Sequence, residues 1–231
     1  MADPLILKAT NLSKTYQSGK ITVEALRDVN FELEKGDFTT IQGPSGSGKT
    51  TLLNLLGGLD TPTSGEILIE GTDIAKMSEK LLAKIRCQRI GFIFQFYNLI
   101  PKMSASENVE LPMIFARVPV AQRKARAKKL LEQVGLGHRL RHAPSELSAG
   151  EQQRVAIARA LANDPAIVLM DEPTGNLDEE NTENIIQLIQ ELNRTQKRTF
   201  VLTTHNLFIT KYANKAYLLH NGKLIKRKQS S

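Results

Sequence analysis

The chain has 231 residues, of which 41% are hydrophobic and 24% charged, and this composition suits one large globular domain or a core with a subdomain. Its single cysteine, Cys87, excludes an intramolecular disulfide and a metal site built from several cysteines. No apolar run approaches the about 18 residues of a membrane helix, and the first residues lack a signal-peptide pattern, so we expect a cytoplasmic protein.

The net charge of +7 gathers partly in residues 123–129 and in the tail 223–228. Such an excess is compatible with nucleic acid, with an anionic membrane surface, or with solubility alone. Because positive charge on a helix is most often a solvated face, we favour solubility, with a nearby membrane leaflet as the second interpretation.

The first third of the chain predicts mainly strands, with short apolar segments at 5–7, 23–26, 29–33, 38–42 and 66–71. A helix is predicted over 49–56, and Gly57-Gly58 ends it. This part of the chain therefore combines antiparallel strands with a strand–loop–helix unit.

The loop of that unit reads Gly43-Pro44-Ser45-Gly46-Ser47-Gly48-Lys49-Thr50 and fits the phosphate-binding pattern G-x-x-x-x-G-K-[ST]. Its glycines let the backbone turn tightly and point N–H groups at an anion, which would also face the positive end of the following helix. Lys49 supplies charge for the β- and γ-phosphates, and the Thr50 hydroxyl can ligate Mg²⁺. The loop predicts nucleotide binding.

The middle of the chain is helical. Ser104 and Glu107 have capping-box spacing and predict a helix start, and 121–134 predicts a second helix that ends at Gly135. Prolines punctuate the region, which we interpret as a helical insertion over roughly 96–162.

The core then resumes with buried strands at 166–170 and 199–203, separated by an amphipathic helix over 178–194. Segments 215–220 and 223–226 flank Asn221-Gly222, a strong hairpin signal. No internal repeat is present.

Two acidic residues, Asp171 and Glu172, follow the strand predicted at 166–170. In a chain with a P-loop, an aspartate there can hold Mg²⁺ through water, and the next carboxylate can accept a proton from an attacking water. The plainer alternative is that acidic residues cap a strand end.

A second anchor is Leu147-Ser148-Ala149-Gly150-Glu151, followed by Gln152-Gln153-Arg154. Ser148 and Glu151 form a capping box, so the free N–H groups of the helix could bind an anion, although capping alone would explain the pattern.

The ordered set of P-loop, residues 147–151, Asp171-Glu172 and His205 resembles the nucleotide-binding subunit of an ABC transporter over nearly the whole chain. The segment 147–151 is similar to the family signature Leu-Ser-Gly-Gly-Gln and departs from it at Ala149 and Glu151. The resemblance implies one α/β ABC ATPase domain over 1–231. It has a P-loop NTPase core with a mostly parallel sheet, an antiparallel N-terminal β subdomain and the inserted helical subdomain.

The resemblance also implies roles. Glu172 matches the catalytic glutamate, His205 the switch histidine on the γ-phosphate, and Gln95 the glutamine that touches Mg²⁺ and the attacking water. With Gln95, the metal would be held by Thr50 and Asp171. The implied nucleotide contacts are Tyr16, which stacks on adenine, Gly43, Pro44, Ser45, Gly46, Ser47, Gly48, Lys49, Thr50 and Thr51, together with Ser148, Ala149, Gly150, Glu151 and the dimer-loop Asp178.

Further stretches resemble the lipoprotein-release and macrolide-export group, namely Gly58-Leu59-Asp60 and residues 90–95, 98–101 and 175–178. The expected cofactors are ATP and Mg²⁺. The expected partners are a second copy of the chain, arranged head to tail, and integral membrane subunits, at the cytoplasmic face of the inner membrane.

Alternatives remain in other classes. An ABC-type ATPase that regulates cell-division or cell-wall machinery without transport would carry the same motifs. A nucleic-acid ATPase of repair or translation is disfavoured, because the chain has no long coiled coil, no zinc module and only one such domain. A GTPase is disfavoured by the missing Asn-Lys-x-Asp motif.

Overall fold

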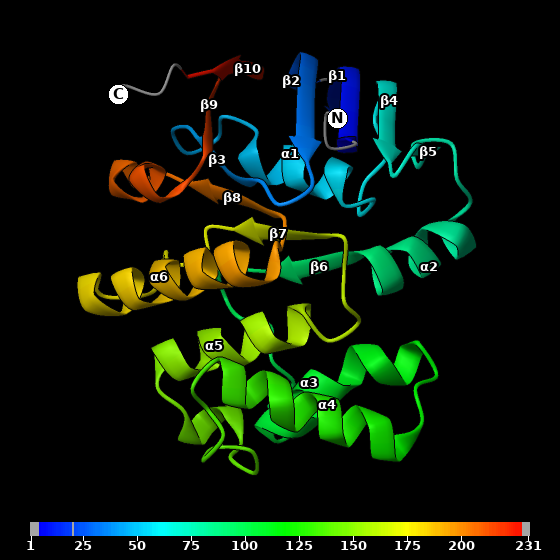
Figure 1. Cartoon of the computed structure of the whole chain (residues 1–231). Coiled ribbons are helices and arrows are strands. Elements are labelled where there is room, and N and C mark those ends of the chain that lie inside the picture. Colours follow the sequence, from blue (N-terminus) through cyan, green and yellow to red (C-terminus); the bar gives the residue numbers. More distant parts are fainter. Residues whose placement is uncertain (1–4, 20, 228–231) are drawn as a thin grey trace.

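A computed structural model of the chain describes residues 5–19 and 21–227, which form two sheets and a cluster of helices (Figure 1). An antiparallel sheet in the order β2-β1-β4-β5 comprises β1 (Leu5–Ser18), β2 (Ile21–Glu34), β4 (Ser64–Ile69) and β5 (Thr72–Asp73). The second sheet has the order β10-β9-β3-β8-β7-β6 and is parallel except for the β9–β10 hairpin. Its strands are β3 (Phe38–Gln42), β6 (Ile90–Ile93), β7 (Ile167–Asp171), β8 (Phe200–Thr204), β9 (Lys215–His220) and β10 (Lys223–Lys226).

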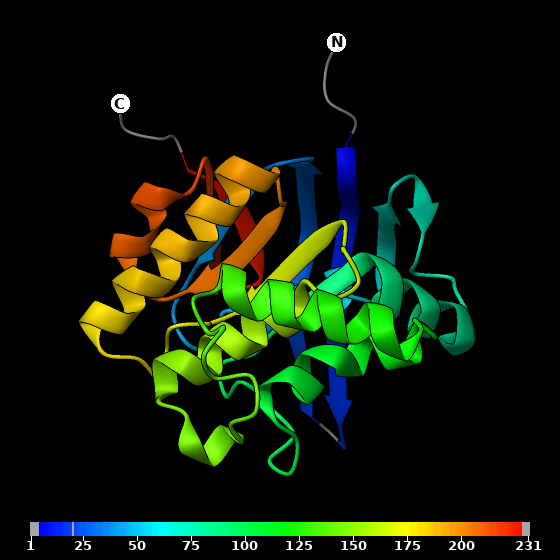
Figure 2. The same ribbon diagram turned by 60° about the horizontal axis from the view of Figure 1, so that its bottom comes forward.

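The helices cover the second sheet and fill the insertion. They are α1 (Lys49–Leu56), α2 (Glu79–Arg89), α3 (Ala105–Phe115), α4 (Val120–Gln133), α5 (Ala149–Ala160) and α6 (Glu179–Gln196), with 3₁₀ segments at Pro144–Glu146 and Leu207–Tyr212. One buried cluster joins the two sheets around α1, and another joins α3, α4, α5 and α6 to the six-stranded sheet. Figure 2 shows α3 and α4 side by side in front of that sheet.

The strands 38–42, 166–170 and 199–203 and the hairpin at Asn221-Gly222 are confirmed to within one residue. The α/β class with an antiparallel N-terminal sheet is confirmed as well. The prediction of three short strands before Gly36 was wrong, because β1 and β2 each run for 14 residues. Register shifts along their pairing let polar residues interrupt the apolar pattern without ending either strand.

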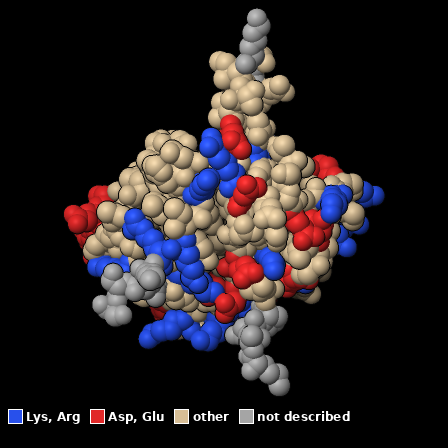
Figure 3. Space-filling view, turned by 90° about the horizontal axis from the view of Figure 1, so that it is seen from above, with Lys and Arg blue, Asp and Glu red and all other residues tan. Residues whose placement is uncertain are grey.

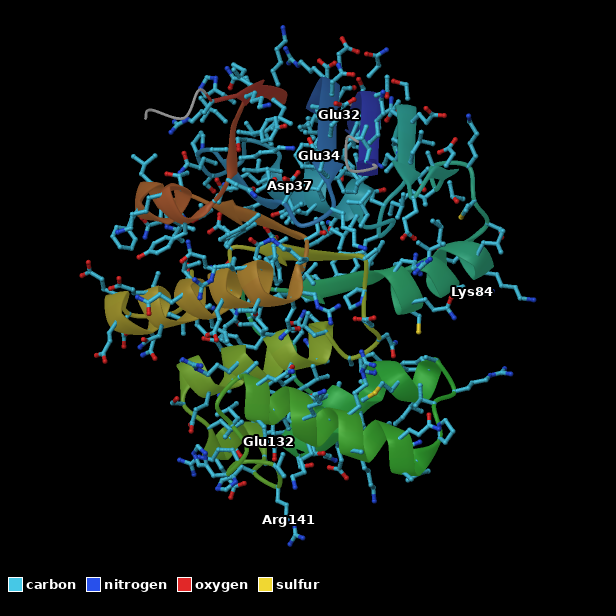
Figure 4. All side chains as sticks on the ribbon, viewed as in Figure 1. Glu32, Glu34, Asp37, Lys84, Glu132 and Arg141 are labelled. Carbon is cyan, nitrogen blue, oxygen red and sulfur yellow. The ribbon has the colours of Figure 1, made fainter. Side chains whose placement is uncertain are left out.

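The helix α2 was not predicted. Only Leu82 among its 11 residues is buried, so the apolar periodicity that marks a helix is almost missing. Residues 96–162 hold α3, α4 and α5; Figure 4 labels Glu132 on α4 and, at the bottom of the view, Arg141 in the loop that follows α4.

Charge is mixed on the face above the antiparallel sheet, where Figure 3 shows Lys and Arg side chains interspersed with Asp and Glu. Interspersed charges of both signs are typical of a solvated surface rather than of a field of one sign. A more buried pairing joins β9 to the end of β2, where Lys215 Nζ donates to Glu34 Oε1 at 2.7 Å and to the buried Asp37 Oδ2 at 2.8 Å; Glu34 and Asp37 are labelled in Figure 4.

Candidate functional site

The loop between β3 and α1 is built as an anion cradle. Gly46 and Gly48 have φ values of +76° and +102°, which side-chain-bearing residues rarely adopt. Gly43 lies so close to β9 that a Cβ atom would stand 2.3 Å from the carbonyl oxygen of Leu219. Among the described residues, the N–H groups of Gly48, Lys49 and Thr50 donate to no acceptor. They are the free donors of a helix start and fit a phosphate group.

The Lys49 side chain contacts the start of this loop and the residue Glu172. Its buried Nζ donates to the carbonyl oxygens of Gly43 at 2.9 Å and Pro44 at 3.1 Å, and it lies 3.3 Å from Glu172 Oε1. The buried Ser47 Oγ beside it has no hydrogen-bond partner in the described part of the chain. A buried hydroxyl and an ammonium held mainly by carbonyl groups are what an entering anion can satisfy.

The end of β7 brings Asp171 to the first turn of α1. Thr50 Oγ1 donates to Asp171 Oδ2 at 2.8 Å, and Thr203 Oγ1 on β8 donates to Asp171 Oδ1 at 2.7 Å. These hydroxyl and carboxylate oxygens are hard donors of the kind that Mg²⁺ prefers, and Mg²⁺ commonly completes its shell with water and phosphate oxygens. The residues present therefore fit the metal predicted for this position.

Glu172 is held in an unusual backbone conformation. Its φ is +44°, and its N–H donates to the carbonyl oxygen and the hydroxyl of Thr203 at 3.2 and 3.1 Å. Such a conformation costs about 1 to 3 kcal/mol and persists only where the surroundings fix it. On the far side of its carboxylate, His205 Nδ1 donates to Oε2 at 2.9 Å. The strand ends thus place one carboxylate between a lysine and a histidine.

Gln95 lies after β6 and contacts the segment that follows Glu172. Asn176 Nδ2 donates to the Gln95 carbonyl oxygen at 2.9 Å, and a Cβ atom on Gly175 would stand 2.8 Å from Gln95 Nε2. Within the described residues, no hydrogen bond joins the Gln95 side chain to Thr50 or Asp171. The structure therefore brings Gln95 to the 172–176 segment but does not hydrogen-bond it to the predicted metal ligands Thr50 and Asp171.

The start of α5 has the predicted capping box. Glu151 N–H donates to Ser148 Oγ at 3.2 Å, and Ser148 N–H donates to Glu151 Oε2 at 2.8 Å. This N–H bond and the nearby Arg139 guanidinium, at 2.9 Å, hold the pKa of Glu151 below its ordinary value. Ser148 and Ala149 themselves are exposed. Ala149 has no positive φ, so the residue that departs from the signature adopts its backbone conformation without strain.

The first turn of α6 packs against the start of α5. A Cβ atom on Gly150 would lie 2.5 Å from Asn181 Oδ1, and Asn181 Nδ2 donates to both carboxylate oxygens of Asp178 at 2.9 and 3.0 Å. Asp178 also caps α6 through the Asn181 N–H at 2.8 Å. The signature segment and Asp178 are therefore tied together through one asparagine.

Two groups of predicted site residues result. The first, Lys49, Thr50, Asp171, Glu172 and His205, is joined by direct contacts. The second, residues 148–151 with Asp178, shares no hydrogen bond or ion pair with the first among residues 5–19 and 21–227. Tyr16 on β1 belongs to neither group, and its hydroxyl donates to Asp60.

The sequence analysis missed three residues: Thr203 and Asn181, which contact predicted site residues, and Arg159, which lies in the last turn of α5. Thr203 and Asn181 act through strand register and helix packing, which a single sequence does not reveal. Arg159 is largely buried, which lowers its pKa, and it donates to the carbonyl oxygens of Tyr97, at 2.7 Å, and Asn98.

Comparison with known proteins identifies the family. A sequence model of the ABC transporter family matches residues 26–175. The chain belongs to this family. It is 55% identical over 202 residues to an uncharacterized ABC transporter ATP-binding protein of Thermotoga maritima, covering 87% of this chain and 86% of that protein.

Solved structures agree with this assignment. The dimeric post-hydrolysis structure of the ATP-binding cassette MJ0796, bound to ADP and Pi, superposes with a TM-score of 0.89 at 42% identity, covering 97% of this chain and 99% of that one. The structure of cbiO1 from Clostridium perfringens, part of the ABC transporter complex cbiONQ, gives 0.86 at 30% identity, covering 96% and 88%. The ABC chain described here is therefore an ATP-hydrolysing subunit of a transporter.

This ABC subunit has no membrane span of its own among the described helices, none of which is both long and apolar enough. It does have a groove of about 950 Å³ where α2 and β6 of the core meet α3 and α5 of the insertion. Lys84, labelled in Figure 4, is one of its lining residues, and Phe115, which is 71% exposed, is another. The lining is largely apolar and includes Leu59, Phe92, Phe94, Leu111, Pro112 and Phe115.

Proposed function

We propose that the chain is the motor subunit of a transporter of the lipoprotein-release or macrolide-export type, bound to membrane subunits at the cytoplasmic face of the inner membrane. It acts as a head-to-tail homodimer, in which the 148–151 segment of one copy covers the nucleotide on the P-loop of the other. One observation carries the proposal. The hydrolytic residues are joined to one another within the chain, while the 148–151 segment begins with the exposed Ser148 and Ala149 and is not joined to them.

In this mechanism the P-loop N–H groups and Lys49 hold the β- and γ-phosphates. Glu172 accepts a proton from the attacking water, and His205 contacts the γ-phosphate. Lys49 exchanges its Glu172 neighbour for phosphate oxygens when ATP enters, which leaves the carboxylate free to orient water. The charge that develops on the phosphoryl oxygens is then stabilised by groups that are already in place.

Thr50, Asp171 and, after closure, Gln95 would hold Mg²⁺, which when bound neutralises charge on the transferring phosphoryl group. Asp171 is kept in position by the Thr203 hydroxyl at 2.7 Å. Thr50 lies on the first turn of α1, so the metal position and the phosphate cradle belong to the same rigid helix.

The apolar groove is proposed to receive a helix of the membrane subunit. It lies between the core and the insertion, and Phe94 and Asn98, on either side of Gln95, line it. A change in the Gln95 loop would therefore alter the surface that meets the membrane subunit. The relative cbiO1 is part of a complex with further subunits, which supports partners of this kind.

The test is Glu172→Gln, which keeps the size of the side chain and removes its capacity as a base. ATP binding should stay within about threefold of wild type, while phosphate release falls by about a hundredfold or more. Light scattering with ATP should report a persistent dimer. Glu180→Gln is the control, because Glu180 is exposed on the first turn of α6 and contacts neither Lys49 nor His205. Wild-type hydrolysis by Glu172→Gln would remove the proposed role.

The transporter class is tested separately. The chain is co-purified with its membrane subunits, reconstituted in vesicles and supplied with ATP. Release of a membrane-anchored lipoprotein or export of a macrolide supports the proposal. ATP turnover without movement of either substrate supports the alternative of a regulatory ATPase.

A further inference from the structure

Asp60, which ends the turn after α1, is a centre of three hydrogen bonds. Lys14 Nζ and the Thr61 N–H both donate to Oδ1 at 2.7 Å, and the Tyr16 hydroxyl donates to Oδ2 at 2.7 Å. Burial alone would raise the pKa of Asp60, but these bonds hold it below the ordinary value. The carboxylate therefore stays charged at neutral pH, and both of its oxygens accept hydrogen bonds.

The ring of Tyr16 is fixed by these contacts from two directions. Its hydroxyl is tied to Asp60, and Lys14 Nζ lies 4.8 Å from the ring centroid, where a cation is attracted to the π face. Lys14 is itself anchored by the Thr61 carbonyl oxygen at 2.7 Å. Tyr16 is still 40% exposed, so the restrained ring keeps surface on which another planar group can stack.

The same turn is fixed to the helix that leaves the P-loop. The N–H groups of Leu59 and Asp60 donate to the Asn54 carbonyl oxygen of α1 at 2.8 and 3.3 Å. Gly58 makes the turn with a φ of +63°. Because α1 begins at Lys49, Asp60 connects the phosphate cradle to an aromatic ring on a different sheet.

We propose that Asp60 is a positioning residue for the nucleotide base, which sets the place of the Tyr16 ring relative to the P-loop. This rests on the proposed ATP-binding function and on the role that the family resemblance implies for Tyr16, stacking on adenine. Because the carboxylate orders the ring before the nucleotide arrives, the base does not have to immobilise it on binding. The acidic residue of the Gly58-Leu59-Asp60 stretch thereby gains a role at the site.

The test compares two probes, ATP and inorganic tripolyphosphate, by calorimetric titration of Asp60→Ala. Loss of the hydrogen bond should weaken ATP binding by about threefold to tenfold. Tripolyphosphate has no base, so its affinity should stay unchanged. The kcat at saturating ATP should also stay unchanged while KM rises, because Asp60 touches no reacting group.

Asp73→Ala is the matched control, since Asp73 also accepts a backbone N–H, from Ala75 at 2.9 Å, and pairs with a lysine, Lys76, at 3.1 Å. It has no contact with Tyr16 and should change neither affinity. If Asp60→Ala weakens both probes equally, Asp60 serves only the fold of α1, and the inference is overturned.

Tyr16→Ala separates the inference from the proposal beneath it. If this variant binds ATP as tightly as wild type, stacking on Tyr16 is wrong. If Tyr16→Ala weakens ATP binding but Asp60→Ala does not, stacking on Tyr16 is supported and the positioning role of Asp60 is wrong. If both weaken ATP, Asp60→Ala should have no further effect in the Tyr16→Ala background, because the ring it positions is gone.

Discussion

The P-loop and the start of α5 are both helix N-termini that can face phosphate, yet the chain treats them differently. At the P-loop, residues from α1, β7 and the segment after β8 contact one another, so the residues proposed to act on phosphate are assembled within one chain. At α5, Ser148 and Ala149 are exposed, and the capping box bonds to the helix start and to Arg139 but to none of the P-loop group. The chain therefore has two helix N-termini that can face a phosphate, but it surrounds only the P-loop with further candidate hydrolytic residues of its own.

The largest effect is expected from Lys49→Ala at the P-loop. It removes the ammonium that contacts Gly43, Pro44 and Glu172, and we expect phosphate release to fall by about a hundredfold or more. Lys76→Ala is the control, because the Lys76 side chain is 80% exposed and its ion pair is superficial. A fall of less than threefold would show that the cradle does not depend on this charge.

The next prediction concerns dimers in which one copy carries Ser148→Arg and the other carries Lys49→Ala. Ser148→Arg should block the exposed end of α5 and leave the P-loop intact, so each variant alone should be inactive. When Ser148→Arg is mixed in equal amounts with Lys49→Ala, half of the dimers contain one copy of each variant. Such a dimer has one intact site, made from the Lys49 of the first copy and the Ser148 of the second. About a quarter of the wild-type rate should return. Circular dichroism checks that Ser148→Arg folds, since a lost cap costs about 1 kcal/mol. No recovery from two folded, dimerising variants would contradict a shared site.

A smaller effect is expected at Gly150. A Cβ atom there would displace the Asn181 amide, which holds the Asp178 carboxylate, so Gly150→Ala should lower phosphate release by about threefold to tenfold. Ala149→Gly is the neighbouring control. Ala149 is unstrained and exposed, so the change should leave hydrolysis within about twofold and destabilise the helix by at most about 1 kcal/mol. Equal effects at the two positions would remove the distinction between them.

Local signals predicted much of this molecule. The capping boxes at Ser104 and Ser148, the hairpin glycine Gly222 and the apolar run of β7 are each written in a few adjacent residues. The length of β1 was not predictable in this way, because it depends on pairing with β2 and β4 on either side. The solvated helix α2 lacks an apolar stripe.

The candidate site likewise contains residues that local motifs predict and residues that depend on long-range pairing. Motif residues such as Lys49 and Glu172 could be predicted, since chain order and residue type identify them. Thr203 could not, because its contact with Asp171 arises from the register of β7 against β8. Asp60 was noticed only as part of a stretch, because its bonds join residues 44 and 46 positions apart.

The helix α5 has a different kind of contact at each end. Its first turn carries the exposed signature residues, and its last turn carries Arg159, which holds the Tyr97 and Asn98 carbonyl groups in a loop where both residues have positive φ. The 12 residues of α5 make a rod of about 18 Å. In the proposed head-to-tail pair, α5 would therefore connect the nucleotide bound by one copy to the groove of the other, in addition to the route through Gln95 within each copy.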